Sequence, residues 1–375
     1  MYAALRDHDP MHHVVDGDYW VLSRFADVWA AARDTTTFSS AEGLTFAYGE
    51  REALALDFAP MVMLDPPEHT AFRRLVARGF TPRAVAEIED DVRAFVVQRI
   101  EALRAAGGGD LVDTLAKPLP SFVVAHYLGV PEEDRGRFDR WTEAIVGAGA
   151  TSDTMLATDA ALELATYFSE LIERRRVEPA DDMTSALVHA DTGGEPVPVL
   201  DILGFAFTMV TGGNDTTTGL LSGTAELLTA NPDQRHRLLE DPTLIPGAVE
   251  ELLRLTSPVQ GLARTTTREV QIGGATVPAG KKVMLLYGAA NRDDREFGPT
   301  AEVLDVGRPI DKILSFSYGA HHCLGAAAAR LQARVTIEEL LTRCPDFAVD
   351  IDAAEFAGGH FVRRHTSLPF VAAAD

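Results

Sequence analysis

Apolar residues recur every three or four positions along most of this chain, which is the spacing of helices that bury one face. Other short stretches alternate apolar and polar residues, which is typical of strands and hairpins. The clearest helical segments are ALELATYFSELIERRR at 161–176, AELLTA at 225–230 and VEELLRL at 249–255. The strand-like segments are 12–25, 269–287 and the end of the chain from 347 to 373. The pattern predicts a mainly α fold with a minor antiparallel β part.

The segment from Asp201 to Ala230 has a different pattern. Its first half is apolar on all sides, as in a helix buried through the middle of a large domain, and a helix of this length would run roughly 45 Å. Its centre, GGNDTTTG, is a poor helix sequence, because glycine and threonine weaken a helix and a buried aspartate needs a polar partner. Two interpretations stay open: a loop between two shorter helices, or a helix locally opened into a ligand groove lined by an acid and an alcohol.

The composition limits the classes of function. The chain has 375 residues, enough for one large domain or two ordinary ones. No repeat, low-complexity linker or block of like charge marks a boundary, so we expect one domain over residues 1–375. There are 34 basic and 56 acidic residues, which give a net charge of −22 and an isoelectric point of about 4.8. This field repels nucleic acid, so we expect no nucleic-acid partner.

The cysteines and the N-terminus indicate where the protein works. Cys323 and Cys344 are the only cysteines, too few for a disulfide framework, which suits a reducing cytosol. The first residues, MYAALRDHDP, lack the charged and then apolar layout of a secretory signal. The longest apolar run is soon interrupted by glycines and polar residues. We therefore expect a soluble, cytoplasmic protein with no membrane partner.

The stretch FSYGAHHCLG, from Phe316 to Gly325, places Cys323 just before an alanine-rich helical segment. Peptide N–H groups and the helix dipole at a helix N-terminus lower the pKa of a thiol. Gly319 and Gly325 would let the backbone curl close around the sulfur. The sequence therefore indicates a site that holds a thiolate, whereas Cys344 fits better as a small buried hydrophobic residue.

A thiolate can be a nucleophile, a zinc ligand, a redox centre or a ligand to haem. Zinc is disfavoured because His321, His322 and Cys323 are consecutive and cannot easily converge on one tetrahedral ion. The sequence lacks the second cysteine of a redox pair and the C-x-x-C-H motif of covalently attached haem. A cysteine hydrolase remains an alternative, although neighbours so close in sequence rarely present both groups to one substrate. Haem ligation needs only one cysteine and cations for the two propionates.

The pattern F-x-x-G-x-H-x-C-x-G is filled here by Phe316, Gly319, His321, Cys323 and Gly325. It resembles the haem-binding loop of the cytochrome P450 family. The similarity extends over essentially the whole chain and is closest in kind to the soluble bacterial members. Three further segments match motifs of that family: DPPEHTAFRR with His69 and Arg73, GGNDTT with Gly212, Gly213, Asp215 and Thr216, and EELLR with Glu251 and Arg254.

The resemblance implies the cytochrome P450 fold, with haem b (iron protoporphyrin IX) between a long central helix and the cysteine-bearing helix. Cys323 would be the proximal ligand to the iron, and its thiolate would favour cleavage of the O–O bond. Phe316 would shield the sulfur from water, beside Gly319 and Gly325. The candidates to bind the haem propionates are Arg73, Arg264 and His321, with His69 on the same helix face as Arg73.

The resemblance also assigns Asp215 and Thr216 to proton delivery. Cleavage of the O–O bond needs protons, which a hydroxyl can orient and a carboxylate with water can supply. Glu251 and Arg254, three residues apart, would form a structural pair across one helical turn.

Two positions depart from the usual pattern of the family. Ser317 stands where glycine is common, and Val303 falls near a position that is often polar or basic. Neither position would touch the iron. The second departure leaves the outer partner of the Glu251 and Arg254 pair unassigned.

The chain contains no flavin unit or G-x-G-x-x-G dinucleotide unit, so the resemblance implies a separate ferredoxin and ferredoxin reductase as electron donors. Basic residues gather in two segments on the cysteine side, despite the acidic total. We hypothesise that they form a docking surface for the electron donor. These residues are Arg73, Arg74, Arg78 and Arg83 in the first segment, and Arg330 and Arg334 in the second.

The implied function is a monooxygenase that inserts one oxygen atom from O2 into a hydrophobic small organic substrate, by hydroxylation or epoxidation. The alternatives are a peroxide-driven haem-thiolate enzyme, which the Asp215 and Thr216 pair disfavours because peroxide arrives already reduced, and a non-catalytic haem-binding protein. By resemblance, mostly apolar segments would line the substrate pocket. These segments are GLTFAYGE at 43–50, AIVGAGATSDTM at 144–155, the groove helix, VQGLA at 259–263 and GGHFVRR at 358–364.

Overall fold

The computed structural model describes residues 1–372 except 54–59, 152–153, 193 and 360. For residues 52–53, 146–151, 154–157 and 192 it describes the backbone alone. Among the helices described, none combines the length and the apolar character that crossing a membrane would require.

The chain forms helices, several of them in succession, and short strands. The helices are α1 (Tyr2–His8), α2 (Phe25–Arg33), α3 (Glu50–Ala53), α4 (Glu68–Val76), α5 (Pro82–Ala86), α6 (Glu89–Ala105), α7 (Pro118–Leu128), α8 (Arg135–Thr151), α9 (Thr154–Val177), α10 (Met183–Val188), α11 (Val199–Ala230), α12 (Pro232–Glu240), α13 (Ile245–Thr256), α14 (Tyr287–Ala290), α15 (Asp294–Phe297) and α16 (Ala326–Arg343). The strands are β1 (Met11–Val14), β2 (Tyr19–Leu22), β3 (Phe38–Ser39), β4 (Gly108–Asp110), β5 (Asp191–Thr192), β6 (Glu195–Pro196), β7 (Leu262–Thr266), β8 (Val270–Ile272), β9 (Ala275–Val277), β10 (Lys282–Leu285), β11 (Ala348–Val349), β12 (Glu355–Phe356), β13 (His365–Ser367) and β14 (Pro369–Val371).

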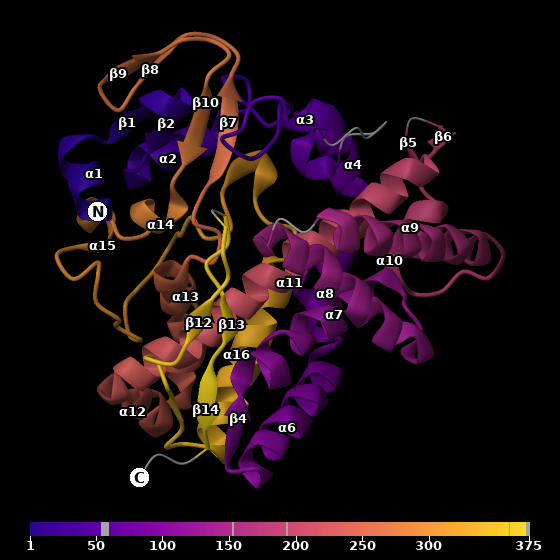
Figure 1. The fold of residues 1–375 in the computed structure, drawn as a ribbon, viewed down its shortest axis with the longest axis vertical. Coiled ribbons are helices and arrows are strands. Elements are labelled where there is room, and N and C mark those ends of the chain that lie inside the picture. The colour runs from indigo at the N-terminus through magenta and orange to yellow at the C-terminus, as the bar shows by residue number, and fades with distance from the viewer. Residues whose placement is uncertain (54–59, 152–153, 193, 360, 373–375) are drawn as a thin grey trace.

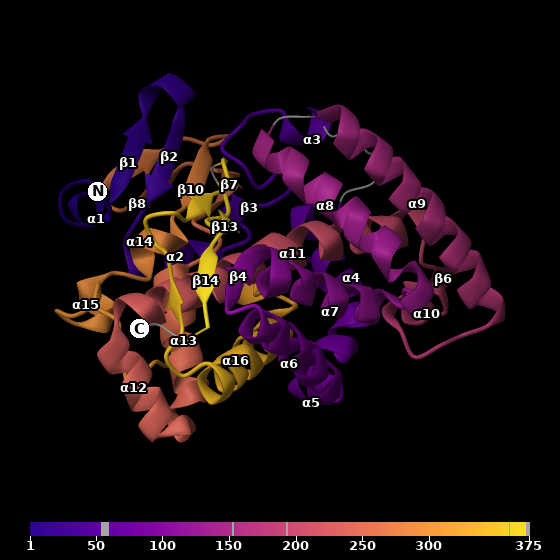
Figure 2. The same ribbon diagram turned by 60° about the horizontal axis from the view of Figure 1, so that its bottom comes forward.

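The helices form the larger body of the molecule, with α11 running through its centre (Figures 1 and 2). α11 packs against α7, α8, α13 and α16, and buried apolar side chains from these helices form the main hydrophobic core. The helical segments predicted at 161–176, 225–230 and 249–255 lie within α9, α11 and α13. The mainly α prediction is confirmed, because the periodic apolar faces are the surfaces that pack around α11.

The central helix is continuous from Val199 to Ala230, so the interpretation as a loop between two shorter helices is wrong. The alternative, a helix that opens locally at this stretch, is not supported by a break either, since the helix runs through it without interruption. Side chains add hydrogen bonds to its poor central sequence: Thr216 Oγ1 donates to the Gly212 carbonyl at 2.8 Å, and Asn214 Nδ2 donates to the Val210 carbonyl at 2.7 Å. Burial within the core outweighs the weak helix propensity of this stretch.

The strands form small sheets at the edge of the helical body, most visible at the upper left of Figure 1. The largest has the order β1-β2-β10-β7-β3, with β1 and β2 as the hairpin predicted at 12–25. β8 and β9 form a second hairpin within the predicted 269–287 segment. The C-terminal strand β14 lies between β11 and β4. The pairs are antiparallel except that β10 runs parallel to β2, so the β part is minor and mainly antiparallel, as predicted.

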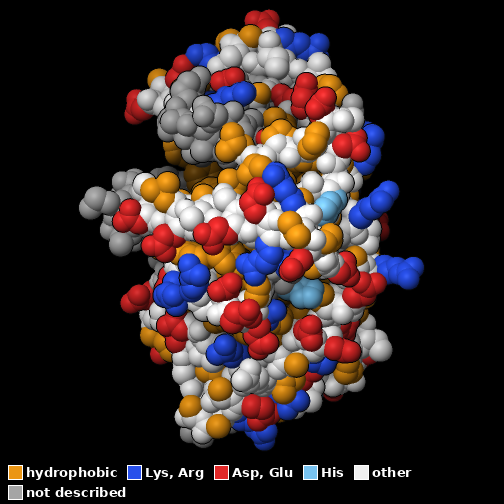
Figure 3. Space-filling model, turned by 90° about the vertical axis from the view of Figure 1, so that its right-hand side faces the viewer, with side chains coloured by type: hydrophobic (Ala, Val, Ile, Leu, Met, Phe, Trp, Pro, Cys, Tyr) orange, Lys and Arg blue, Asp and Glu red, His pale blue; other side chains and the backbone are white. Residues whose placement is uncertain are grey.

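Acidic and basic side chains are interspersed over the face of the molecule that Figure 3 shows, with apolar side chains between them. Neighbouring opposite charges on this face screen one another.

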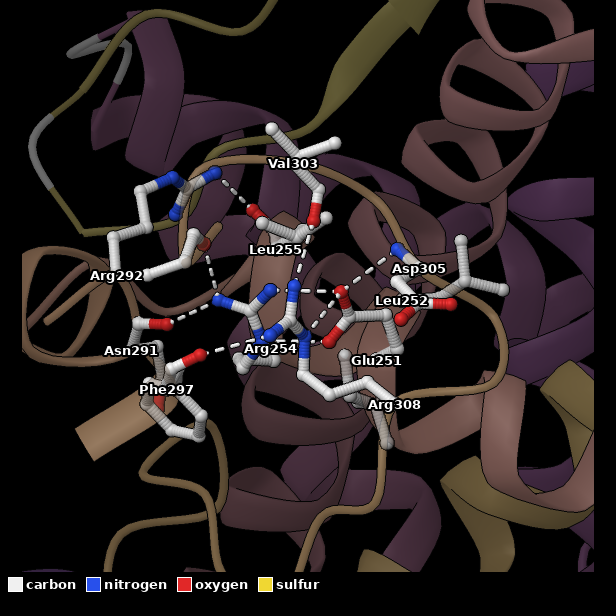
Figure 4. Close-up of polar contacts among 12 residues, drawn as sticks. Glu251, Leu252, Arg254, Leu255, Asn291, Arg292, Phe297, Val303, Asp305 and Arg308 are labelled. Atoms are coloured by element: carbon white, nitrogen blue, oxygen red, sulfur yellow. Dashed lines mark hydrogen bonds and ion pairs between the residues drawn. The ribbon is translucent and has the colours of Figure 1, made fainter. Parts of the chain in front are cut away.

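A buried ion-pair network ties α13 to the segment that follows α15 (Figure 4). Glu251 and Arg254 are both fully buried and share two hydrogen bonds, of 2.7 and 2.8 Å. The remaining guanidinium nitrogen of Arg254, Nη1, donates to the carbonyl oxygens of Asn291 and Ala301, at 2.7 and 2.6 Å. The pair is therefore a fully satisfied buried network, which stabilises specific contacts between distant segments.

Arg308 supplies the outer partner that the sequence left unassigned. Its Nε donates to Glu251 Oε1 at 3.1 Å, and its Nη2 donates to the Val303 carbonyl at 3.2 Å. The Asp305 backbone N–H also donates to Glu251 Oε1, at 3.1 Å. The segment around Val303 thus takes part in the Glu251 network through its backbone groups. An apolar side chain is therefore tolerated at position 303.

We predict that Arg308→Leu destabilises the fold by about 3 kcal/mol, because it removes one partner from a buried charge. Arg237→Leu is the matched control, since Arg237 pairs with Asp305 at the surface, where both side chains are more than 40% exposed, and its loss should cost less than about 1 kcal/mol. Chemical unfolding of the two variants measures the difference. Equal losses would show that the Arg308 contact has no special weight.

Candidate functional site

A cavity of about 420 Å³ lies between α11 and the segment that precedes α16. Its walls are mostly apolar and include side chains of α7 and α11 and of the chain next to β7 and β13. Apolar walls with few polar groups are typical of sites for hydrophobic molecules. The polar or ionisable side chains at the cavity that matter here are His69, Arg73, Thr216, His321 and Cys323.

The cysteine-bearing segment contains two tight backbone positions. Gly319 has φ of +74°, and a Cβ there would lie 3.0 Å from the Ala32 carbonyl oxygen, so glycine is required. Ser317, at the position where the family commonly has glycine, also has a positive φ, of +54°. The Tyr287 hydroxyl donates a hydrogen bond to Ser317 Oγ at 3.1 Å. This contact helps to hold the strained serine in the conformation that glycine would adopt freely.

Cys323 lies three residues before α16, whose N-cap is Gly325. The Cys323 backbone N–H donates to the Phe316 carbonyl at 2.8 Å, which closes the loop. Its thiol is open to the cavity but surrounded by protein, and this burial raises the pKa of Cys323, while the Gly325 backbone, Arg73 and Arg330 act in the opposite direction. The predicted lowering of the thiol pKa is therefore wrong for the protein chain alone, because desolvation outweighs the helix N-terminus.

Cationic and imidazole side chains gather near the same cavity. Arg264, on β7, is buried and donates to its neighbouring carbonyl, and Arg73 comes from α4. Neither arginine forms an ion pair with any residue that the structure describes. The rings of His69 and His321 lie 4.3 Å apart, and His321 Nε2 is 3.2 Å from Ser40 Oγ. The structure thus brings together the four predicted propionate-binding residues.

The two histidines are neutral in the chain without a bound anion. Burial lowers the pKa of His321 to about 3, helped by the nearby charges of Arg264, His69 and Arg73. Burial also lowers the pKa of His69, whose Nδ1 is buried without a hydrogen-bond partner among the described residues. Each ring can therefore offer a hydrogen bond, whereas the positive charge comes from the arginines.

These features fit haem. A buried Arg264 without an anionic partner and an orphaned imidazole nitrogen on His69 both call for an acceptor, which the porphyrin carboxylates would supply. The apolar walls suit the faces of the ring, and the one cysteine at the cavity is a ligand of the right type for its iron. The fold and this cavity together define the class of a haem-thiolate protein.

α11 brings the predicted acid and alcohol close to the cavity, but in different settings. Thr216 and Gly212 lie on the cavity wall. Asp215 instead contacts Arg364, with Oδ1 of the carboxylate 2.5 Å from Nε of the guanidinium. Burial raises the pKa of Asp215 to about 6, and Arg364 and Lys117 oppose this rise. A carboxyl group with such a pKa can take up and release protons near neutral pH.

Most segments predicted to line the substrate pocket contribute to the cavity. Leu44 comes from GLTFAYGE, Val259 and Leu262 come from VQGLA, and Phe361 and Val362 come from GGHFVRR. Of the segment 144–155, residues 152–153 and the side chains from 146 onward lie outside the part of the chain that the structure describes.

Three contributions were missed by the sequence reasoning. α7 supplies cavity residues that include Val123, Val124 and Tyr127. Arg308 joins the Glu251 network, and Arg364 pairs with Asp215. Arg364 stands in a segment already assigned to the pocket, but no local pattern in the sequence links it to an aspartate that precedes it by about 150 residues.

Comparison with known proteins identifies the family. The family model "Cytochrome P450" matches residues 59–350. The chain is 63% identical to "Cytochrome P450 130" of Mycobacterium tuberculosis over 99% of this chain and 94% of that protein. It is 36% identical to "Vitamin D(3) 25-hydroxylase" of Pseudonocardia autotrophica, over 98% of this chain and 92% of that protein.

Solved structures agree with this result. Cytochrome P450 CYP268A2 of Mycobacterium marinum, in complex with pseudoionone, matches with a TM-score of 0.90 at 33% identity, over 99% of this chain and 93% of that chain. CYP109E1 of Bacillus megaterium, in complex with testosterone, matches with a TM-score of 0.89 at 29% identity, over 100% of this chain and 98% of that chain. The chain belongs to the cytochrome P450 family. It is a haem-containing oxidoreductase of the monooxygenase type.

Proposed function

We propose that this protein inserts one oxygen atom from O2 into a hydrophobic small organic molecule. The observation that carries the proposal is the Cys323 thiol at an apolar cavity whose wall also contains Thr216 of α11. When bound, haem b supplies the iron at which oxygen is activated. The cavity excludes bulk water from this chemistry because most of its wall is apolar.

The cofactor would be held by the cysteine loop and by arginine and histidine side chains that form no ion pair with any residue in the described part of the chain. Cys323 would ligate the iron, and Phe316, whose ring centre lies 4.6 Å from the Arg330 guanidinium, would shield the sulfur from water. Arg73 and Arg264 would pair with the propionates. His69 and His321 add hydrogen bonds, and Gly319 and Gly325 allow the close backbone turn.

Thr216 and Asp215 would move protons. The Thr216 hydroxyl already donates to the Gly212 carbonyl at 2.8 Å, which fixes its position on the cavity wall. While that hydrogen is engaged, the Thr216 oxygen can still accept a hydrogen bond, so it would orient a water molecule that carries protons from Asp215 to the cavity. Asp215, with a pKa raised to about 6, would refill the relay from water.

The substrate would be hydrophobic or amphipathic. The described wall has few fixed charges apart from those assigned to the haem propionates. Two neighbours in the fold are described in complex with pseudoionone and with testosterone, and one relative is named as a hydroxylase of vitamin D(3).

We further propose that residues 1–375 form one haem domain, since cavity residues extend from Leu44 to Val362.

The electron donor would be a ferredoxin reduced by a ferredoxin reductase. The protein would act in the cytoplasm, where both of its cysteines can stay free as thiols.

The predicted docking surface needs a correction. Arg330 is paired with Glu250 at 2.5 Å, and Arg334 is paired with Glu89 at 2.5 Å. These two arginines therefore contribute little net charge at the surface.

The remaining basic residues form a smaller surface on α4 and the chain up to α5. Arg74, Arg78 and Arg83 are exposed, and none of them forms an ion pair within the described part of the chain. We define these three residues as the α4 basic surface. It is adjacent in sequence to Arg73 at the cavity, and its positive charge suits an acidic ferredoxin.

The first prediction concerns the cysteine. Carbon monoxide should give the reduced protein the strongly red-shifted Soret band of thiolate-ligated haem, and Cys323→Ser should lose that band because a serine oxygen replaces the thiolate sulfur. Cys344→Ser is the matched control, since Cys344 is buried at the end of α16 and should leave the band unchanged. Folded protein that binds no haem would overturn the proposal.

The second prediction concerns Thr216. Thr216→Ala should keep haem and substrate binding but release a larger share of the consumed O2 as hydrogen peroxide, at least about twofold, because proton delivery fails. Thr211→Ala is the control, as the Thr211 hydroxyl makes the same type of bond, to the Phe207 carbonyl. Peroxide release per O2 consumed is the measurement. Unchanged coupling in Thr216→Ala would remove Thr216 from the relay.

The third prediction concerns the α4 basic surface. Reversing its charge with Arg74→Glu and Arg78→Glu should slow reduction by ferredoxin about tenfold at low salt, and added salt should shrink the difference. Arg104→Glu is the control, because Arg104 is an exposed arginine in the last turn of α6 and does not belong to the α4 basic surface. Stopped-flow reduction at two salt concentrations tests this, and an equal effect of all variants would contradict the docking surface.

A further inference from the structure

The chain just before β13 lies between the cavity and α11. Phe361 and Val362 are part of the cavity wall, and their backbone is fixed on one side by hydrogen bonds to the chain after α13. The Gln260 N–H donates to the Phe361 carbonyl at 2.8 Å, and the Arg363 N–H donates to the Pro258 carbonyl at 2.8 Å. We refer to residues 361–365 as the wall segment.

The other side of the wall segment is attached to α11 by charged side chains. Arg364 pairs with Asp215 at 2.5 Å. About three turns further along α11, His365 Nε2 lies 3.3 Å from Glu226. Arg363 also reaches Glu226, at 3.5 Å. The approach is close: a Cβ on Gly219 of α11 would lie 2.5 Å from the Arg363 carbonyl oxygen. Glycine at that turn of α11 is what lets the wall segment reach the helix.

The Arg364 and Asp215 contact differs from the surface ion pairs of this protein. The Arg364 side chain is 10% exposed and that of Asp215 is 22% exposed. Opposite charges in such a setting are weakly screened, so the guanidinium attracts the carboxylate and favours its charged form against the effect of burial. By contrast, Arg363 is 42% exposed and is tied to Glu226 rather than to Asp215.

We propose that Arg364 is a positioning residue for proton delivery: it holds the Asp215 carboxylate beside Thr216 and connects that carboxylate to the wall segment that contacts the substrate. The inference rests on the proposed function, in which Asp215 and Thr216 move protons. It goes beyond that function because it assigns the placement of the acid to a residue near the C-terminus. A substrate that moves Phe361 or Val362 would thereby act on the proton relay.

The charges around Asp215 give the direction of the pH effect. The described groups whose charges act on Asp215 are Arg364, before β13, and Lys117, before α7, and Lys117 is itself paired with Glu143 of α8 at 2.6 Å. Burial raises the pKa of Asp215 to about 6, and both cations hold it down. Loss of Arg364 leaves the burial in place, so the pKa of Asp215 rises further. As the pH falls, the Asp215 carboxylate of the variant would therefore become protonated at a higher pH than that of the wild type. Below that pH, the charged form that takes up protons would be missing.

The test uses the holoenzyme with a ferredoxin, its reductase and O2, with no added substrate, and follows hydrogen peroxide released per O2 consumed across pH. We expect Arg364→Gln to raise the peroxide share about twofold near pH 7 and to move the midpoint of its pH dependence upward by about one unit. Arg364→Lys, which keeps the charge, should restore most of the wild-type profile. Arg363→Gln is the matched control and should leave the midpoint in place.

A second readout does not depend on turnover. Thermal unfolding of the holoenzyme should show that Arg364→Gln lowers Tm more at about pH 8, where Asp215 is charged and unpaired, than at about pH 5. Asp215→Asn combined with Arg364→Gln should abolish that pH dependence, because no charge is then left buried. A Tm loss that is equal at both pH values and unaffected by Asp215→Asn would assign Arg364 a general packing role and overturn the inference.

The outcomes distinguish a failure of the Arg364 positioning role from a failure of the proton relay itself. If Arg364→Gln has the same peroxide profile as Arg363→Gln while Thr216→Ala and Asp215→Asn raise peroxide release, the positioning role of Arg364 is wrong and the proposed function stands. If Thr216→Ala and Asp215→Asn also leave peroxide release unchanged, the proton relay itself is wrong.

Discussion

The buried carboxylate of Glu251 is the constraint on which the geometry of the cysteine site depends. It binds Arg254 and Arg308, and Arg254 in turn donates to the Asn291 carbonyl at 2.7 Å. The Asn291 side chain then accepts from the Leu314 N–H at 2.8 Å and donates to Ser315 at 2.9 Å. The cysteine loop starts directly after these residues. One buried charge is thus connected through hydrogen bonds to the position of the sulfur.

The cavity combines a stable apolar wall with polar groups that have no protein partner. Arg264 is buried without an ion pair in the described chain, and His69 Nδ1 has no hydrogen-bond partner there. Leaving such groups unpaired costs free energy, which a dianionic cofactor offsets when it binds. The raised pKa of Cys323 follows the same logic, since burial outweighs the Gly325 backbone and the nearby arginines, and a bound metal cation would favour the thiolate. The site is therefore complete only with haem.

Under the proposed function, the opposite wall of the cavity would link substrate contact to proton delivery. α11 presents Thr216 to the cavity and directs Asp215 toward Arg364, so the alcohol and the acid meet different surroundings although they are neighbours in sequence. The wall segment carries both Arg364 and the apolar residues Phe361 and Val362. Because its backbone is hydrogen-bonded to the chain after α13, it connects three parts of the site.

Local spacing in the sequence encodes the mainly helical fold and the cysteine loop, through apolar periodicity and a glycine-flanked cysteine, and it places an alcohol next to an acid. The continuity of the central helix comes from the folded chain: GGNDTTTG stays helical because burial in the core outweighs propensity. The pairing of Glu251 with Arg308 and of Asp215 with Arg364 also comes from the tertiary structure, because these partners are far apart in sequence and no local pattern encodes such pairs. The pKa of Cys323 likewise depended on burial, which is a property of the folded chain and not of the motif.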